Sequence, residues 1–268
     1  MTDGLVSIIT SLYNSGKFIG RAIESVQAQT YQNWEMIVTD DCSTDGGPSI
    51  VEKYAAADPR IKLLRMKENG GPGRCRNNSI QNANGRYIAI LDSDDKWLPD
   101  KLEKQLQLMK DKCCGMVHSS YYVCNEDGKI YGLVRCKRKV KYWRMVCDNA
   151  IGFLTMMYDR TMTGDLLMPT IRKRQDWGFN IKLLKVCRVA FGVDEPLAVY
   201  TIRENSISRD KLSLTKYNIA IYNEVLHYSK LKSVLMFYCV FAPFYGGKKF
   251  LNYLKTRCFS NKYSIPKS

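Results

Sequence analysis

The sequence lacks the cysteine spacings of a disulfide framework or a zinc ribbon. Its ten cysteines are scattered, Cys113 and Cys114 are adjacent, and no pair has the CxxC spacing. Small disulfide-bonded domains and zinc ribbons depend on regular spacings of this kind. We therefore expect reduced thiols that are mostly buried as small apolar side chains.

Apolar runs long enough to span a membrane are also missing, and the first residues show no signal-peptide pattern. The opening residues, MTDGLVSIIT, hold no basic segment ahead of an apolar stretch, so we expect no signal peptide and a cytoplasmic protein. The apolar run SVLMFYCVFAPFYGG, Ser233 to Gly247, is too short to cross a bilayer and contains Pro243. With 268 residues, 45% of them hydrophobic, the chain can bury a full core without a metal or a disulfide.

Acidic residues are absent from His227 to Ser268. The whole chain has a net charge of +15 and a pI near 9.3, which indicates an anionic partner such as nucleic acid, anionic lipid or a phosphorylated ligand. The basic residues of this C-terminal part are Lys230, Lys232, Lys248, Lys249, Lys255, Arg257, Lys262 and Lys267.

Two interpretations of this basic tail stay open. In one, it lies on the anionic cytoplasmic leaflet as an aromatic-rich amphipathic segment. In the other, it packs on the domain as a helix with a solvated basic face. A second basic stretch, RCKRKVKYWR from Arg135 to Arg144, is able to serve the same membrane surface.

The first half of the chain alternates strand and helix patterns. Strands are expected at residues 6–10, 35–39, 61–64 and 87–91, with helix signals between them. Such alternation is typical of parallel βαβ units in an α/β protein. Further on, MVHSSYYVCNEDGKIYG predicts a β-hairpin around residues 125–128.

Three carboxylates follow the last of these strands. The apolar run Tyr87 to Leu91 leads directly into Asp92, Asp94 and Asp95. Neighbouring like charges are unfavourable unless a cation joins them. Mg²⁺ and Mn²⁺ prefer oxygen ligands and are often shared with substrate phosphates, so these residues indicate a metal that holds a diphosphate. The alternative is that they only cap the helix beginning near Pro99.

Other polar clusters fit a nucleotide site beyond the carboxyl ends of the strands. Asp41 ends the second strand in VTDDCSTDGG, where it can accept a hydrogen bond from a base or ribose. GGPGRCRNN offers glycines for close backbone approach and Arg76 for contact with a phosphate or base. Gln175 and Asp176 begin a later helix, predicted to be amphipathic, in a cationic setting. His118 follows apolar residues on an expected strand and is interpreted as a core or rim histidine.

In this order, the motifs resemble the inverting family 2 glycosyltransferases of the GT-A fold. The segments that carry the resemblance are VSIITSLYN, SVQAQTYQNWEMIVTDDCSTD, RNNSIQNANGRYIAILDSDDKWLPDKL, KRQDW and YTIRENSIS. It extends to about Arg209 and is strongest with small bacterial enzymes of capsule, O-antigen and teichuronic acid synthesis. It implies an α/β GT-A domain in residues 1–210, with a nucleotide-binding half at 1–112 and an acceptor half at 113–210. A basic amphipathic helical extension would occupy 211–268.

The resemblance also implies a role for each matching residue. The UDP-sugar would be bound by Ser11, Tyr13, Asp41, Arg76, Asp92, Ser93 and Arg203, with Tyr13 stacked on the uracil. Asp94, together with Asp92, would ligate Mn²⁺ or Mg²⁺. Asp95 would support the loop, Asp176 would be the general base, and Gln175 and Trp177 would face the acceptor. The family usually has Glu where this chain has Gln175, and Pro-Thr-Tyr-Asn where this chain has SLYN.

The expected reaction is transfer from a UDP-sugar to a hydroxyl of a polyprenyl-diphosphate-linked saccharide, which forms a β-glycosidic bond at the inner face of the bacterial cell membrane. A sugar-nucleotide nucleotidyltransferase is the alternative enzyme, but SLYNSGKF after the first strand has a single Gly and a single Lys where such enzymes carry a glycine-rich basic loop. A nucleic-acid-binding protein is a further alternative. The acids at the strand ends argue against it, because without a metal they would repel phosphates.

Overall fold

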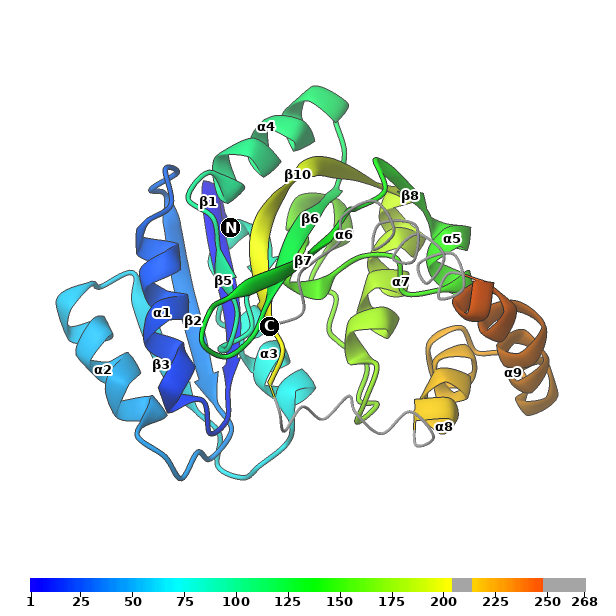
Figure 1. Ribbon diagram of the computed structural model, residues 1–268, viewed down its shortest axis with the longest axis horizontal. Coiled ribbons are helices and arrows are strands. Elements are labelled where there is room, and N and C mark those ends of the chain that lie inside the picture. The colour runs from blue at the N-terminus through cyan, green and yellow to red at the C-terminus, as the bar shows by residue number, and fades with distance from the viewer. Residues whose placement is uncertain (204–213, 248–268) are drawn as a thin grey trace, which may run out of the picture.

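A central sheet of ten strands runs through the protein and joins a parallel half to a mixed half (Figure 1). The computed structural model describes residues 1–203 and 214–247. The strand order is β3-β2-β1-β4-β9-β6-β10-β5, with β7 paired to β6 and β8 paired to β10. The strands are β1 (Thr2–Leu12), β2 (Trp34–Asp40), β3 (Ile61–Arg65), β4 (Gly85–Ile90), β5 (Lys96–Trp97), β6 (Met116–Cys124), β7 (Ile130–Val134), β8 (Lys139–Lys141), β9 (Met157–Asp159) and β10 (Val189–Thr201).

Helices cover both faces of this sheet (Figure 1). The α-helices are α1 (Gly16–Gln27), α2 (Gly47–Ala57), α3 (Pro72–Gln81), α4 (Lys101–Lys112), α5 (Tyr142–Cys147), α6 (Arg160–Thr163), α7 (Gln175–Cys187), α8 (Leu214–Ala220) and α9 (Lys230–Met236). Short helical turns of other types are η1 (Phe153–Thr155), η2 (Ile221–Val225) and η3 (Phe237–Phe241).

The parallel half confirms the βαβ prediction. Strand β1 pairs in parallel with β2 and β4, and β2 pairs in parallel with β3. All four predicted strands form, and each predicted helix lies between them. The expected hairpin is also present, because β6 and β7 pair antiparallel across residues 125–128.

Alternation along the strands divides the buried side chains between two cores. On β1, Ile8 packs with α1 side chains such as Ile19 and Ile23, whereas its neighbour Ile9 faces a second cluster that includes Ile80 of α3. Successive side chains on a strand point to opposite faces, so a continuous apolar run is buried on both sides. This explains why the central strands read as unbroken hydrophobic segments.

Helix α7 differs from the expected amphipathic helix. Most of its side chains are buried, including Phe179, Ile181 and Leu184. Its outward side is covered by the C-terminal helices, since Tyr222 and Phe241 belong to the same core cluster. The described part of the C-terminal extension therefore packs on the domain, as the second interpretation of the tail expects.

The remaining basic tail residues, Lys248, Lys249, Lys255, Arg257, Lys262 and Lys267, lie outside the described residues. Within 1–203 and 214–247, none of the helices is both long and apolar enough to cross a membrane. His118 on β6 is fully buried, in agreement with its interpretation as a core histidine.

Candidate active site

The carboxyl ends of β1, β2 and β4 meet at one edge of the sheet. Ser11 at the end of β1 is in register with Thr39 of β2, and Ile9 is in register with Ile90 of β4. The polar residues that follow these strands are therefore neighbours in space. This edge gathers most of the predicted nucleotide-binding residues.

The turn after β1 presents Tyr13 to solvent. The ring of Tyr13 is 50% exposed, while the next residue, Asn14, has a positive φ of 45°. The Asn14 side chain accepts a hydrogen bond of 2.8 Å from the backbone N–H of Thr44 and so fixes this uncommon conformation. An exposed ring beside this fixed turn, at the end of a strand, suits the stacking of a base.

The carboxylate of Asp41 organises the loop before α3. It accepts hydrogen bonds from the backbone N–H groups of Gly70 at 2.7 Å and Gly71 at 2.8 Å. Gly71 has a φ of 80°, which favours glycine at this position. Asp41 is only 3% exposed, so its expected bond to a base imide stays a prediction.

Two arginines pair with the acidic loop that follows β4. Arg76 of α3 forms an ion pair with Asp92, and Arg203 after β10 lies 3.6 Å from Asp94. Burial and the neighbouring Asp92 carboxylate raise the pKa of Asp94. The carboxylates are therefore close enough to repel one another, and cations offset that repulsion.

Asp95 supports the same loop, as expected. It is almost completely buried and accepts a 2.8 Å hydrogen bond from the backbone N–H of Thr201. Burial, and then the charge of Asp94, raise the pKa of Asp95 well above its ordinary value. This bond ties the acidic loop to the end of β10, which carries Arg203.

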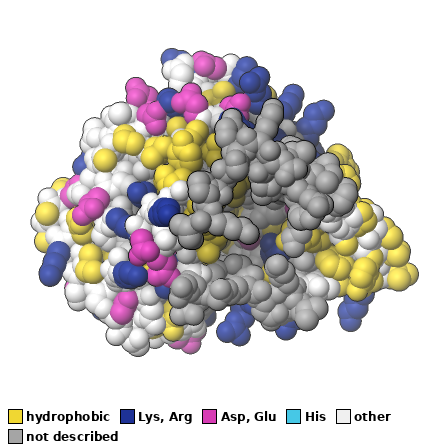
Figure 2. All heavy atoms as spheres, viewed as in Figure 1, with side chains coloured by type: hydrophobic (Ala, Val, Ile, Leu, Met, Phe, Trp, Pro, Cys, Tyr) yellow, Lys and Arg dark blue, Asp and Glu magenta, His cyan; other side chains and the backbone are white. Residues whose placement is uncertain are grey.

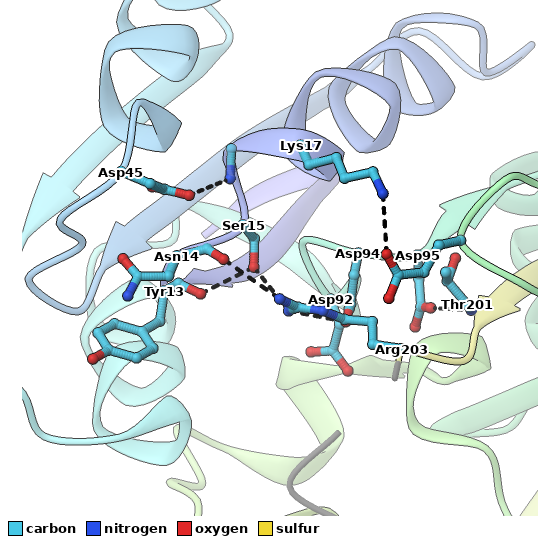
Figure 3. A network of polar contacts seen from close by, with 12 residues as sticks. Tyr13, Asn14, Ser15, Lys17, Asp45, Asp92, Asp94, Asp95, Thr201 and Arg203 are labelled. Atoms are coloured by element: carbon cyan, nitrogen blue, oxygen red, sulfur yellow. Dashed lines mark hydrogen bonds and ion pairs between the residues drawn. The ribbon is translucent and has the colours of Figure 1, made fainter. Parts of the chain in front are cut away.

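Figure 3 shows Arg203 between the turn after β1 and the carboxylate of Asp94. Its guanidinium lies 3.3 Å from Ser15 Oγ and stacks over the Phe18 ring at 5.1 Å from the centroid. A cation between the turn that presents Tyr13 and the acidic loop is in a suitable place to meet a diphosphate.

Arg21 was not identified from the sequence. Its guanidinium donates to the carbonyl oxygen of Asp94 and to Thr201 Oγ1, both at 3.4 Å, and to the carbonyl of Glu126 at 3.1 Å. It thus joins α1, the acidic loop, β10 and the hairpin. A single arginine on an amphipathic helix carries no local signal for such a role.

Asp176 lies at the second position of α7, and a second unpredicted residue orients it. Asn149 Nδ2 donates a 2.7 Å hydrogen bond to Asp176 Oδ2. The adjacent Gln175 is buried and packs so closely against Gly73 that a Cβ there would lie 2.5 Å from Gln175 Cδ. Since Gly73 is in α3, the helix of Arg76, this contact connects the candidate base to the nucleotide edge.

The expectation for Trp177 is wrong. Its ring is completely buried, its Nε1 donates to the carbonyl of Met145 at 2.6 Å, and it packs against Phe241. A ring enclosed in this way is not available to stack on an acceptor sugar. Ser93 is also buried, at 6% exposure, while Ser11 is half-buried at the end of β1. The nucleotide roles of both serines, and the acceptor role of Gln175, stay predictions.

The chemistry of the acidic loop fits a divalent cation. Among the described residues there is no group of three or more His, Cys, Asp or Glu side chains able to hold a metal by themselves. Asp92 and Asp94 supply hard oxygen ligands, and Mg²⁺ or Mn²⁺ commonly completes its shell with substrate phosphates and water. A metal shared with a diphosphate is thus compatible with these two carboxylates.

Comparison with known proteins agrees with the geometry. Glycosyl transferase family 2 matches residues 7–164. TuaG from Bacillus subtilis, assigned to teichuronic acid biosynthesis, is 41% identical over 229 residues, which cover 84% of this chain and 91% of TuaG. WfgD from Escherichia coli, a UDP-Glc:α-D-GlcNAc-diphosphoundecaprenol β-1,3-glucosyltransferase, is 35% identical over 81% of this chain and 84% of its own.

Solved structures share the fold. S. aureus TarS 1–349 in complex with UDP-GlcNAc has a TM-score of 0.70 at 22% identity, covering 86% of this chain and 70% of the TarS chain. The mannosyltransferase PcManGT from Pyrobaculum calidifontis, in complex with GDP-Man and Mn²⁺, has a TM-score of 0.64 at 19% identity over 86% of this chain and 67% of its own. With its GT-A-like sheet and the sequence match, this chain belongs to glycosyl transferase family 2.

Proposed function

We propose that the protein is a metal-dependent, inverting glycosyltransferase that moves a sugar from UDP to a hydroxyl of a polyprenyl-diphosphate-linked saccharide. The observation that carries the proposal is the acidic loop, where Asp92 and Asp94 pair with arginines at the sheet edge that also presents Tyr13. The product would be a β-glycoside of a growing cell-surface chain.

The donor would lie along the edge from β1 to β4. Tyr13 would stack on uracil, Ser11 and Asp41 would meet the base, and Arg76 and Arg203 would contact the nucleotide and its diphosphate. Ser93 would line the same pocket. UDP as the nucleotide is supported by the TarS complexes with UDP and UDP-GlcNAc.

Asp94, with Asp92, would hold Mn²⁺ or Mg²⁺. Such an ion, when bound, neutralises the charge that develops on the leaving diphosphate. Arg203 would add a fixed positive charge on the same side, because its guanidinium already lies beside Asp94.

Asp176 would take the proton from the acceptor hydroxyl as that oxygen attacks the anomeric carbon. Asn149 would fix one carboxylate oxygen and leave the other for the acceptor. Attack from the face opposite UDP inverts the anomeric centre, and no covalent intermediate is needed. Neutral Gln175 leaves this base unchanged but removes a charge near the acceptor.

The acceptor class rests on the relatives and on charge. WfgD is named for transfer to a GlcNAc on diphosphoundecaprenol. Arg172, Lys173 and Arg174 directly precede α7 and would suit a lipid diphosphate. Such an acceptor would place the enzyme at the inner face of the membrane. In this proposal the protein does not bind nucleic acid.

Titration calorimetry tests the proposal. UDP, GDP and CMP are titrated with and without Mn²⁺ into the wild type, Asp94→Ala and the control Asp111→Ala, whose carboxylate is exposed on α4. We expect manganese-dependent binding of UDP that Asp94→Ala abolishes and Asp111→Ala preserves. Equal binding of all three nucleotides without metal, or no binding, would show that the acidic loop is structural.

A further inference from the structure

The segment formed by α9 and η3, residues 230–241, has apolar side chains on two opposite sides. One side is buried: Phe237 and Phe241 belong to the core cluster that contains Trp177. The other side faces solvent, with Leu231 72% exposed, Leu235 52% exposed and Tyr238 60% exposed. A helix at the surface of a soluble domain ordinarily turns polar residues outward.

The exposed side chains form one continuous stripe, which we call the α9 face. Leu231, Leu235 and Tyr238 are spaced by four and three residues, so they lie on the same side of the helix. Val234, at 37% exposure, and Cys239 are also exposed. Figure 2 shows hydrophobic side chains gathered at this end of the molecule, over α8 and α9. A contiguous apolar patch of this kind marks an interaction surface.

The charges around the α9 face select an anionic partner. Exposed Lys230 and Lys232 stand at its start, and Arg144 of α5 lies over the ring of Phe244, which is 48% exposed just beyond η3. Arg144 is ion-paired with Asp148 at 3.1 Å, so the uncompensated charge is that of Lys230 and Lys232, and the sequence has no acidic residue after Glu224. A second copy of this chain would bring like charges together, whereas an anionic lipid surface supplies both an apolar layer and the opposite charge.

We propose that the α9 face docks on an anionic bilayer, with Leu231, Leu235 and Tyr238 inserted at the level of the headgroups. The buried side of the same helix, through Phe241 and Trp177, connects the docked surface to α7 and thus to Asp176. This inference rests on the proposed function in one respect: a polyprenyl-linked acceptor is presented at the same surface.

Vesicle co-sedimentation of the full chain tests the docking. Wild type and the double variant Leu231→Ser/Leu235→Ser are mixed with vesicles of phosphatidylcholine alone or with phosphatidylglycerol. The matched control is Tyr131→Ser/Leu133→Ser, which removes two exposed apolar side chains from β7. We expect wild type and control to bind the anionic vesicles, and the α9 variant to bind about tenfold more weakly.

Partitioning of the α9 variant equal to wild type would overturn the proposal, as would an equal loss in the control. Sedimentation velocity without lipid identifies another occupant: dimerisation abolished by the α9 substitutions would make this face a contact between two copies. Thermal melts establish that each variant is folded. UDP calorimetry on the same samples separates the docking proposal from the proposed function. A variant that no longer binds vesicles but still binds UDP shows that its defect lies in the α9 face and not in the nucleotide site.

Discussion

Each charged side chain at the candidate active site is held by a partner from a distant part of the chain. Arg21 and Thr201 are 180 positions apart, and Asp176 depends on Asn149, 27 positions before it. A buried or half-buried polar group needs such partners, because an unpaired one loses the hydrogen bonds of water. The candidate site residues are therefore positioned by contacts that arise only from folding.

Replacement of Asn149 by alanine should slow the chemical step without weakening the binding of the UDP-sugar. The Nδ2 donor that fixes Asp176 Oδ2 at 2.7 Å would be lost, while Tyr13 and Asp94 are untouched. We expect kcat to fall by about 10- to 100-fold, since misplacement of a general base has effects of that size. Steady-state kinetics should show an unchanged KM for the UDP-sugar. The control is Asn82→Ala, an exposed amide at the end of α3, and a kcat for Asn149→Ala within twofold of this control would contradict the role.

His118 should make the protein less stable in mild acid. Burial lowers the pKa of His118 from 6.5 to about 4, and both ring nitrogens are buried without a hydrogen-bond partner in the described part of the chain. Between these two values the unfolded chain binds a proton that the folded chain does not, so the free energy of unfolding falls as pH falls.

Urea unfolding of wild type and His118→Leu at pH 7 and pH 5 measures this effect. We expect wild type to lose about 2 kcal/mol more than the variant between these pH values. Acidic groups with raised pKa, such as Asp95, act in the opposite direction but are common to both proteins and cancel in the comparison. Parallel losses in the two proteins would show that His118 does not titrate as its burial implies.

Single residues differ in how far the sequence predicts them. Asp92, Asp94 and Asp95 are visible because carboxylates directly after a buried strand have few structural explanations. Arg21 and Asn149 have ordinary sequence surroundings, so no local pattern reveals them. The prediction for Trp177 was wrong because it rested on its position next to Asp176. Neighbouring side chains in a helix point about 100° apart, so the two residues do not face the same way.

At the scale of helices and strands, the candidate active site depends on how α3 packs against α7. The start of α3 carries Gly71 and Gly73, and the absence of a side chain at Gly73 lets Gln175 pack directly on the helix. Long strands and helices of the first half were predictable from their periodicity. Strands β5 and β9 were not, because two or three residues are too few to show alternation.

Replacement of Gly73 by alanine on α3 should displace the candidate base, Asp176, on the neighbouring helix α7. Its Cβ would lie 2.5 Å from Gln175 Cδ, and Gln175 is buried, so Gly73→Ala forces that side chain and the start of α7 to shift. We expect a loss of about 1–3 kcal/mol in unfolding free energy and a lowered kcat. Chemical denaturation and kinetics measure both.

Gly46→Ala is the matched control, since its Cβ would meet nothing within 4 Å and its φ of −73° is ordinary. A double variant, Gly73→Ala/Gln175→Ala, removes the clash and should recover most of the lost stability. Equal behaviour of Gly73→Ala and Gly46→Ala would mean that α3 and α7 are not coupled through this contact.

At the scale of the whole molecule, the C-terminal helices complete the second core. Tyr222 and Phe241 pack against the ring of Trp177 on α7, so without residues 214–247 that ring would lose much of its cover. From the sequence, the C-terminal segment could be either a helix packed on the domain or a tail bound to a membrane. Its apolar residues lie on two sides of the helix, so they fit either environment. The structure explains the ambiguity: one side is buried in the core and the other is exposed.

Phe241→Ala should therefore destabilise the entire protein rather than only its C-terminus. The ring is 5% exposed, lies 4.9 Å from Trp177 and 5.6 Å from Phe237 between centroids, and its removal leaves a cavity against α7. We expect a loss of about 3 kcal/mol in a single cooperative unfolding transition. Tyr238→Ala, three residues earlier on the exposed α9 face, should change the free energy of unfolding by less than about 0.5 kcal/mol in the absence of lipid. If Phe241→Ala instead produced a separate early transition, with the remainder unfolding as in wild type, the C-terminal helices would be an independent appendage, and docking of the α9 face could not be transmitted to Asp176 through the shared core.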